Sequence, residues 1–351
     1  MPCYRSRTVT AASIPEADTS APSLTSRLFS RRTVLSFAAA ATILAVAIWR
    51  ADIPWGETWN RIRHADLRLY ALALTVYYAE YIVRGARWKV LLRNAGEKRR
   101  LVPLTEILLV SFFVNCVVPA KMGDIYRAVL ARQREAIPGS KAFGTVVAER
   151  LIDLLVLMSL LIIAAALTFH KNVPHFLVPY LVAGVLLCAI GVSVLVVMRL
   201  GRGQRLLRLL PDRVVERYES FRHGAVHAMG RWHEVLPLSV AIWALEATRL
   251  GLIVFALGAG SLLGPAQFLL VALIAALLTT VPFTPGGVGL VELGMVGVLI
   301  NITSIPRSAA VSIALLDRSV SYLSLVIVGF IVFTAGHVRV ESSRSTRRAE
   351  A

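Results

Sequence analysis

The chain has 351 residues, of which 56% are hydrophobic and 17% are charged, and its mean hydropathy is +0.67. Soluble domains carry a smaller apolar share and a larger charged share, so this composition excludes a water-soluble globular protein and indicates one embedded in a membrane. The formal charge of +17 does not indicate nucleic-acid binding, because the basic residues stand in the connections between apolar runs and form no single basic face.

The N-terminal segment, residues 1–30, is rich in Ser, Thr, Pro and Ala and poor in large apolar side chains, so we expect it to be disordered. Ser30, Arg31 and Arg32 then begin a stretch similar to a twin-arginine export signal, followed by an apolar run over residues 34–49. Cleavage after this run is one interpretation. We favour a retained first helix with a basic cytoplasmic flank, because an internal repeat provides it with a counterpart later in the chain.

Eight further apolar segments follow in chain order. A helix of about 20 residues crosses a hydrocarbon layer, and in that layer a helix satisfies its own backbone hydrogen bonds. The segments do not alternate in polarity as strands do, so the sequence predicts an all-α polytopic membrane protein. They cover residues 67–92, 104–118, 143–169, 176–198, 236–258, 266–282, 286–301 and 308–334.

Proline and glycine interrupt the chain at two junctions between these segments. The first junction contains Pro119 and Gly123, and the second reads Pro-Gly-Gly-Val-Gly from Pro285 to Gly289. Proline lacks a backbone N–H and clashes with the preceding turn, so we expect it to break a continuous helix. The four residues named here are therefore predicted hinges, and the alternative is a simple kink that allows close packing.

An internal repeat connects the two junctions. At an offset of 166 residues Pro119 aligns with Pro285 and Gly123 with Gly289. An acid followed by arginine recurs at an offset of 168 residues, as Glu149-Arg150 and Asp317-Arg318. Because these matches keep the same order at nearly constant spacing, duplication of one membrane unit is the better interpretation.

The distribution of basic residues predicts the topology. Segments assigned to the cytoplasmic side carry 29 Lys and Arg, whereas those assigned to the other side carry six. Both flanks of 104–118 are basic, so we expect this region to enter the membrane from the cytoplasmic side and to return to that side. The matching region 266–301 has almost no basic flank, so we expect it to enter the membrane from the opposite side. Each copy then crosses the membrane three times. Because three is an odd number, the second copy starts on the opposite side of the membrane and is inverted relative to the first.

The predicted organisation is therefore six full transmembrane helices plus two re-entrant helical hairpins, with both termini cytoplasmic. We divide the membrane domain, residues 31–340, into repeat one over 31–172 and repeat two over 173–340. The basic connection 199–234 lies in the cytoplasm, and 341–351 is a disordered tail.

With these motifs the chain resembles the lysylphosphatidylglycerol synthase transmembrane-region family, also called the flippase-like domain family. The resemblance covers about residues 31–340 and implies a multi-pass protein of the cell membrane that moves polar-headed lipids between leaflets. The chain ends shortly after its last helix, so we do not expect the aminoacyl-transferase domain of the synthases. The residues that carry the resemblance are Arg87-Trp88, Leu91-Leu92, Asn115, Pro119, Gly123-Asp124, Arg127, Glu149-Arg150, Asp153, Thr284 to Gly289 and Glu292.

Ionisable residues inside the predicted helices are the first candidates for a substrate site. Such groups cost about 2.5 to 3.5 kcal/mol each in a bilayer, so they face a polar cavity or one another. Glu149, Arg150 and Asp153 lie on or near one helical face, and Asp317 and Arg318 supply the matching wall in the second repeat. We expect these five to line a head-group cavity; an ion-paired anchor near the cytoplasmic entry is the alternative.

The two broken junctions supply the other candidates. The Gly286-Gly287 turn exposes backbone N–H groups at a helix start, where a phosphate is favoured. Lys121 and Arg127 add positive charge at the first junction, and Asn115 lies beside them. The acidic residues there are candidates for a cationic head group or a coupling proton: Asp124 and Glu292.

Other polar residues have simpler interpretations. Glu80 with Arg84, and Glu246 with Arg249, stand at helical spacings of four and three, and we expect internal pairing more than substrate contact. We predict no metal site at His223 and His227, because no acid or cysteine accompanies them. Cys3, Cys116 and Cys188 are far apart, so we expect no disulfide framework.

Three functions remain open. The leading one is a flippase-type transporter in which inverted halves rock around a central cavity that holds an anionic or lipid-linked head group. The second is a membrane-embedded enzyme with Asp124, Glu149 or Glu292 as acid or base, although we find no catalytic motif. The third is an accessory scaffold for lipid synthesis, with a lipid-synthesis enzyme as its partner. We predict no cofactor, and the oligomeric state is not indicated.

Overall fold

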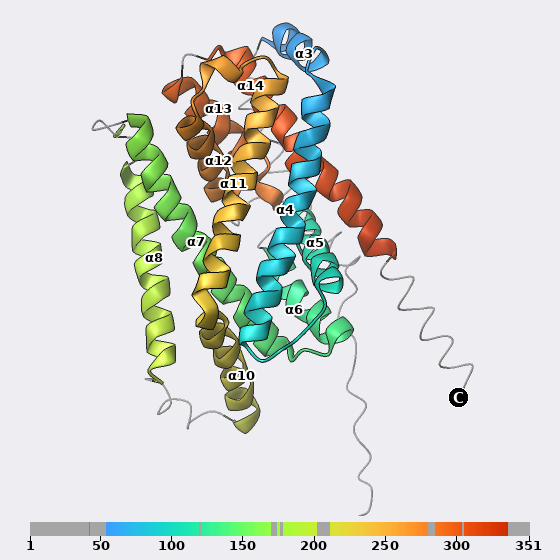
Figure 1. The fold of residues 1–351 in the computed structure, drawn as a ribbon, viewed down its shortest axis with the longest axis vertical. Helices are drawn as coiled ribbons and strands as arrows, with labels where there is room; N and C mark the ends of the chain where they lie inside the picture. Colours follow the sequence, from blue (N-terminus) through green and yellow to red (C-terminus); the bar gives the residue numbers. More distant parts are fainter. Residues whose placement is uncertain are drawn as a thin grey trace, which may run out of the picture.

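The computed structural model describes residues 42, 54–118, 121–169, 174–175, 178–201, 211–279, 285–303 and 305–335. Within these residues all regular secondary structure is helical (Figure 1), which confirms the all-α fold class. The predicted first helix over 34–49 (apart from residue 42), the segments 1–30 and 341–351, and Pro119 lie outside the described residues. The main helices are α3 (Trp55–Arg63), α4 (Leu67–Asn94), α5 (Leu101–Val117), α6 (Met122–Glu135), α7 (Gly139–Phe169), α8 (Val178–Arg199), α10 (Asp212–Ala228), α11 (Trp232–Ala256), α12 (Pro265–Thr279), α13 (Leu290–Ile302) and α14 (Arg307–Arg318).

The protein is a membrane protein by the length and polarity of these helices. Four helical stretches of the described chain are long and apolar enough to cross a membrane: 139–169, 181–199, 212–256 and 307–335. Helix α4 is 28 residues long but carries charged residues along its length, which lowers its apolar character. Its start is set by Asp66, whose carboxylate accepts the backbone N–H groups of Arg68 at 2.7 Å and Leu69 at 3.3 Å.

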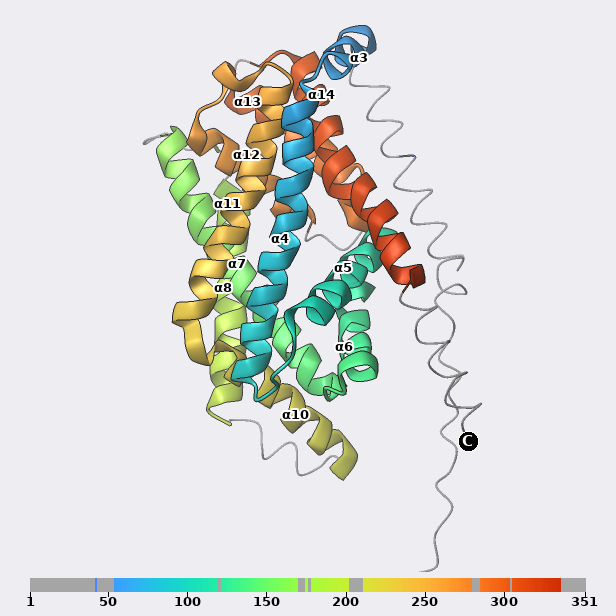
Figure 2. The ribbon, with the colours of Figure 1, turned by 45° about the vertical axis from the view of Figure 1, so that its right-hand side comes forward.

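Helices α4 and α11 pack side by side through the centre of the molecule. Two pairs of shorter helices pack around them, and Figures 1 and 2 place these pairs at opposite ends. The pair α5–α6 lies toward the end where α10 lies, and the pair α12–α13 lies toward the end where α3 lies. Helix α7 contacts both α6 and α12, so it connects the two ends.

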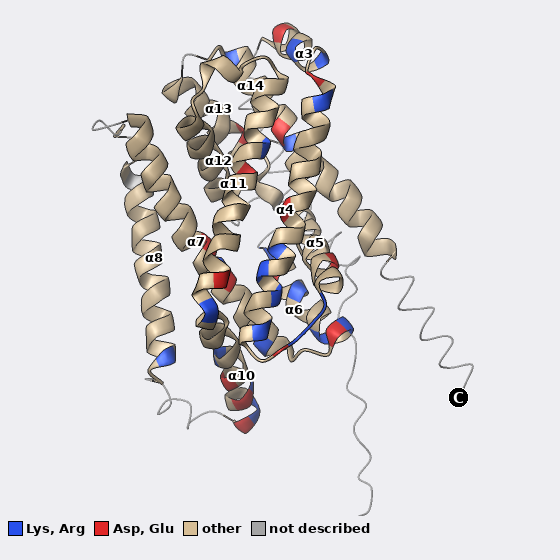
Figure 3. Ribbon diagram, viewed as in Figure 1, with Lys and Arg blue, Asp and Glu red and all other residues tan. Residues whose placement is uncertain are grey.

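The outer helices present apolar side chains to the surroundings. On α8 the side chains of Val182, Leu186 and Ile190 are exposed, and beyond α14 so are Phe330 and Ile331. Such a surface suits hydrocarbon, because lipid tails solvate leucine and isoleucine side chains as well as a protein core does. Figure 3 shows basic residues on α10 and on the ends of α4, α6 and α8 at the α10 end. At the other end, basic residues lie on α3 and at the start of α4.

Three helical features were not predicted from the sequence. Helix α3 packs against α14 in a region read as a connection. Helix α6, which follows the first predicted break, extends over a stretch that was counted as a basic cytoplasmic flank. Immediately after Arg318 the last helix changes to π-helical geometry over Ser319–Ser324 (η4) before it continues to residue 335. Insertions of this kind often occur at functional sites, because they re-aim side chains within a helix.

Candidate functional site

The first charged group, here called the paired cluster, consists of Arg87, Arg127, Glu149 and Asp153, all buried. Arg87 on α4 donates to Asp153 Oδ1 at 2.5 Å, to Asp153 Oδ2 at 3.0 Å and to Glu149 Oε1 at 3.0 Å. Arg127 on α6 donates to Glu149 Oε2 at 2.8 Å. Every carboxylate oxygen of the cluster therefore accepts a hydrogen bond from a guanidinium, which offsets the cost of burying the charges.

Neighbouring side chains complete the paired cluster. The guanidinium of Arg127 lies over the ring of Trp88, 3.8 Å from its centroid, and Trp88 Nε1 donates to Thr145 at 3.1 Å. Arg87 also donates to Ser239 Oγ on α11 at 3.1 Å. The cluster thus connects α4, α6, α7 and α11, and it forms a rigid base beside the cavity described next.

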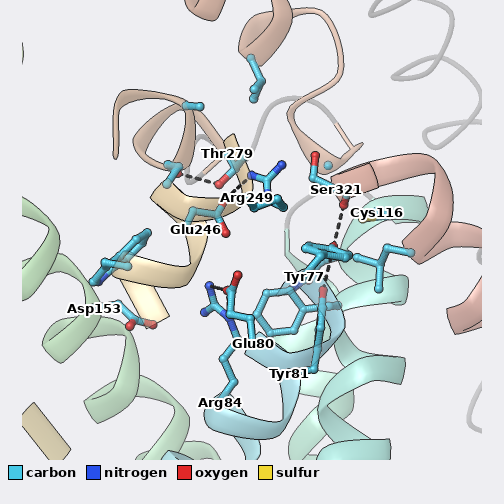
Figure 4. A pocket seen from close by; sticks show the side chains of 18 of the residues that line it. Tyr77, Glu80, Tyr81, Arg84, Cys116, Asp153, Glu246, Arg249, Thr279 and Ser321 are labelled. Atoms are coloured by element: carbon cyan, nitrogen blue, oxygen red, sulfur yellow. Dashed lines mark hydrogen bonds and ion pairs between the residues drawn. The ribbon is translucent and has the colours of Figure 1, made fainter. Parts of the chain in front are cut away.

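A cavity of about 220 Å³ lies between the central helices and the two short helix pairs. Helices α4, α5, α7, α11, α12 and α14 all contribute to its wall, and Figure 4 shows several of the side chains that point into it. One part of the wall is apolar, with Leu154, Leu157 and Trp243, and another part is charged. A wall of both kinds suits an amphipathic ligand better than a free ion.

The second charged group, here called the cavity cluster, lines this cavity with Glu80, Arg84, Glu246, Arg249 and Asp317. Arg84 pairs with Glu80 at 2.5 Å along α4, and Arg249 pairs with Glu246 at 2.5 Å along α11. Arg249 also pairs with Asp317 on α14. The cluster therefore joins the two central helices to the last helix.

Two further arginines reach the cavity from the ends of the molecule. Arg150 on α7 forms a bidentate pair with Asp124 on α6, with both donor–acceptor distances at 3.0 Å. Arg318 on α14 donates to Glu292 on α13 at 2.8 Å. The acid lies 26 residues before the arginine in both cases, so the same pair recurs at the two broken helix pairs.

Lys121 adds a third positive charge to the cavity wall at the first junction. It lies at the N-terminus of α6 in the left-handed region, with φ 51°, and it lines the cavity with Asn115. No hydrogen bond or ion pair of its ammonium group is present among the described residues. A cation that lines a cavity is available to an anionic ligand.

The two junctions are built from close backbone contacts. The Gly123 N–H donates to Asn115 Oδ1 at 2.8 Å, and its carbonyl accepts from Ser111 Oγ at 2.9 Å. A Cβ at Gly123 would collide with the Ser111 carbonyl oxygen. Gly123 therefore allows α5 and α6 to approach each other closely.

At the second junction Gly286, Gly287 and Gly289 have positive φ angles of 57°, 73° and 86°, which glycine adopts at low cost. The Gly289 N–H donates to Glu292 Oε2 at 2.7 Å, and Arg318 Nη2 donates to the Gly286 carbonyl at 2.8 Å. The negative charge that the start of α13 favours is thus supplied by the protein itself at Gly289, where we had expected a phosphate.

Some of the predicted site residues line the cavity and the others do not. The cavity wall includes Asn115, Lys121, Arg150, Asp153, Gly286, Asp317 and Arg318. Asp124 and Glu292 do not line the cavity but accept hydrogen bonds from the arginines that do. Arg127 and Glu149 are fully buried in the paired cluster. Gly287 and the hinge glycines shape the junctions without lining the cavity.

Sequence reasoning underestimated the two acid–arginine pairs of the central helices. We expected Glu80 with Arg84, and Glu246 with Arg249, to pair internally; they do, and they also line the cavity. Their signal in the sequence was the position of charges near the middle of apolar segments. The aromatic lining, including Tyr77, had no sequence signal, because aromatic residues are common in any membrane helix.

Within the described part of the chain no three His, Cys, Asp or Glu side chains gather as metal ligands do. His223 and His227 stack on each other with ring centroids 4.1 Å apart on α10. Cys116 is buried and Cys188 is half-buried, and both are free thiols.

Comparison with known proteins gives one family. The family model for the lysylphosphatidylglycerol synthase TM region matches residues 34–329. A UPF0104 membrane protein of Methanocaldococcus jannaschii is 29% identical over 222 residues, which is 63% of this chain and 93% of that protein. A UPF0104 membrane protein of Methanothermobacter thermautotrophicus is 23% identical over 329 residues, 86% of this chain and 92% of that protein. The glycosyltransferase AglD of Haloferax volcanii is 26% identical over 327 residues, which cover 82% of this chain and 52% of AglD.

Proposed function

The chain belongs to the family of the lysylphosphatidylglycerol synthase transmembrane region, and from this premise we propose that it transports a polar-headed lipid between membrane leaflets. The observation that carries the proposal is the cavity, whose wall combines several cations with apolar side chains. Lys121, Arg150 and Arg318 are suited to bind the phosphate of a head group. The apolar wall is suited to the start of the acyl chains.

The recurrence of one acid–arginine pair in the two halves of the chain supports a transport mechanism. The pair Asp124–Arg150 in the first half has its counterpart in Glu292–Arg318 in the second half, and the broken helix pairs lie at opposite ends of the molecule. We propose that the halves are inverted copies, with six full crossings and two re-entrant hairpins. Rocking of one half against the other then exposes the cavity to each side in turn.

The orientation follows from the basic residues. They crowd the α10 end of α4, α6 and α8 (Figure 3), and we propose that this end faces the cytoplasm. We also propose that both termini are cytoplasmic and that the protein resides in the cell membrane.

An enzymatic role is the second candidate, and the match to AglD is the observation that favours it, since that relative is named a glycosyltransferase. The match spans about half of AglD, 52%. Asp124, Glu149 and Glu292 were the candidate acids or bases, but each accepts a hydrogen bond from an arginine. For this chain we therefore favour transport, with a lipid-linked sugar and an anionic phospholipid as the head groups to be tested.

Reconstitution into liposomes tests the proposal. We would place fluorescent phosphatidylglycerol, a fluorescent neutral phospholipid or a lipid-linked sugar in the vesicles, and follow head-group exposure with an impermeant reductant. We expect the protein to accelerate redistribution of at least one polar-headed lipid. The double variant Arg150→Gln with Arg318→Gln should reduce that rate by at least about tenfold, because two cations that hold the head group are lost.

The matched control is Arg217→Gln, which removes an exposed arginine on α10, far from the cavity wall. It should transport like the unaltered protein. Redistribution of none of the three lipids, with folded protein present in the vesicles, would exclude transport. If the double variant and the control moved lipid at equal rates, transport would not depend on the proposed cavity.

A further inference from the structure

The cavity cluster contains two acids that face each other across the central helix pair. Glu80 on α4 and Glu246 on α11 both line the cavity, and Figure 4 shows their carboxyl groups pointing toward one another. Each also has an arginine on its own helix, Arg84 for Glu80 and Arg249 for Glu246. The remaining contact between the acids is therefore one of oxygen with oxygen.

One oxygen of this contact has no donor. Glu80 Oε1 accepts from Arg84 Nε at 2.6 Å, but Glu80 Oε2 has no hydrogen-bond partner among the described residues. The Glu80 side chain is 2% exposed, so water reaches that oxygen only through the cavity. In the paired cluster, by contrast, each oxygen of Glu149 and Asp153 accepts from an arginine. A buried acceptor facing a second acceptor indicates that something positive belongs between them.

The charge balance of the cavity cluster also indicates that a positive charge belongs between the two acids. Of the other cations that line the cavity, Arg150 and Arg318 are paired with Asp124 and Glu292, and Lys121 lies at the first junction. Counted by themselves, the three carboxyl groups of the cavity cluster (Glu80, Glu246 and Asp317) and its two guanidinium groups (Arg84 and Arg249) are one positive charge short of neutral. A single proton supplies that charge and lets one carboxyl donate to the other. A metal ion fits poorly, because it needs more oxygen ligands than one facing pair and both flanks hold guanidinium groups.

We propose that Glu80 and Glu246 bind one proton between their carboxyl groups, and that this proton controls the contact between α4 and α11. With the proton bound, one carboxyl donates to the other and the two helices stay together. When the proton leaves to water in the cavity, two carboxylates face each other and repel, which favours separation of the helices. The other titratable or charged groups that line the same cavity are Tyr77, Tyr81, Arg84, Cys116, Lys121, Arg150, Asp153, Arg249, Asp317 and Arg318.

Binding of the proton does not depend on the proposed function. Its effect on lipid movement does, since it rests on transport through the same cavity. There the proton would bias the halves toward one of their two arrangements, and a proton gradient would give the movement a direction.

Infrared difference spectroscopy tests the site directly. The intact protein in nanodiscs of phosphatidylcholine alone would be titrated with base, and the carbonyl band of a protonated carboxyl followed. We expect one such band to disappear as the pH rises, and we expect Glu80→Gln and Glu246→Gln each to lack it. Glu216→Gln, at an exposed position on α10, should retain the band. A band that persists in both cavity variants, or no titrating band in the unaltered protein, would overturn the proposal.

The liposome assay then separates the two proposals. If the band titrates but no lipid moves, the proton site stands and transport fails. If lipid moves and the band is absent, transport stands and the proton site fails. If both hold, Glu80→Gln should abolish the pH dependence of lipid movement, while Glu216→Gln should leave that dependence unchanged.

Discussion

The paired cluster and the cavity cluster consist of the same types of charged side chain but differ in their hydrogen bonds and in their access to the cavity. Both consist of arginines and carboxylates on membrane helices, and both are nearly inaccessible to bulk solvent. In the paired cluster all four carboxylate oxygens accept from arginine, and only Asp153 reaches the cavity. In the cavity cluster all five members line the cavity, and Glu80 Oε2 lacks a donor. The first arrangement suits a permanent structural joint, and the second suits a site that changes its charge.

The largest expected effect separates these roles through Arg87. Arg87→Ala leaves Glu149 and Asp153 buried with fewer partners, so we expect a loss of about 3 to 5 kcal/mol in the free energy of unfolding. Unfolding in mixed detergent micelles measures it, with the exposed Arg217→Ala on α10 as the control. A loss no greater than that of the control would show that the paired cluster is not a structural joint.

Arg249 is the matched position in the cavity cluster. Arg249→Ala removes the arginine that pairs with Glu246 and Asp317. Both acids line a cavity, where water can take the place of the lost partner. We therefore expect a smaller loss, about 1 to 3 kcal/mol, in the same unfolding measurement. If Arg249→Ala destabilised the protein more than Arg87→Ala, the distinction between the two clusters would be wrong.

Ser239 tests the paired cluster at a single neutral hydrogen bond. Ser239→Ala removes the acceptor that lies 3.1 Å from Arg87 Nη1, while the carboxylates keep their arginine. We expect a loss of about 1 kcal/mol in the free energy of unfolding and no change in lipid movement. An effect as large as that of Arg87→Ala would mean that Ser239 does more than accept this bond.

The smallest expected effect is at Glu80. Glu80→Gln keeps an oxygen for Arg84 and places an N–H group toward Glu246, so the free energy of unfolding should change by no more than about 0.5 kcal/mol. Glu149→Gln is the matched change in the paired cluster, and there one of two arginines loses its acceptor. Equal destabilisation by the two substitutions would contradict the comparison.

The positions of the helices were predictable from the sequence. Hydropathy predicted 67–92 and 143–169, and the structure has α4 and α7 there, because long apolar runs must hydrogen-bond their own backbone. Pro285 and its glycines predicted the second junction, where positive φ angles require glycine. Helix α3 was not predicted, because nine residues of mixed polarity carry too weak a signal until α14 packs against them.

Which charged residues reach the cavity was not predictable from the same sequence. Glu149 and Arg150 are neighbours on α7 and were expected on one wall; Arg150 lines the cavity, while Glu149 points into the protein toward Arg87 and Arg127. Successive helical residues point about 100° apart, so the rotation of α7 decides which of the two faces the cavity. That rotation depends on how α7 packs against its neighbours.

The sequence alone determined that this is a helical membrane protein, where its helices are broken, and that an acid–arginine pattern recurs in it. These properties follow from local chemistry, since hydropathy, proline and glycine act on the backbone where they stand. The tertiary structure decided which acid meets which arginine and that Glu80 faces Glu246 across α4 and α11. In a medium of low polarity each charge needs a nearby partner, and only the packing of distant helices determines which partner is near.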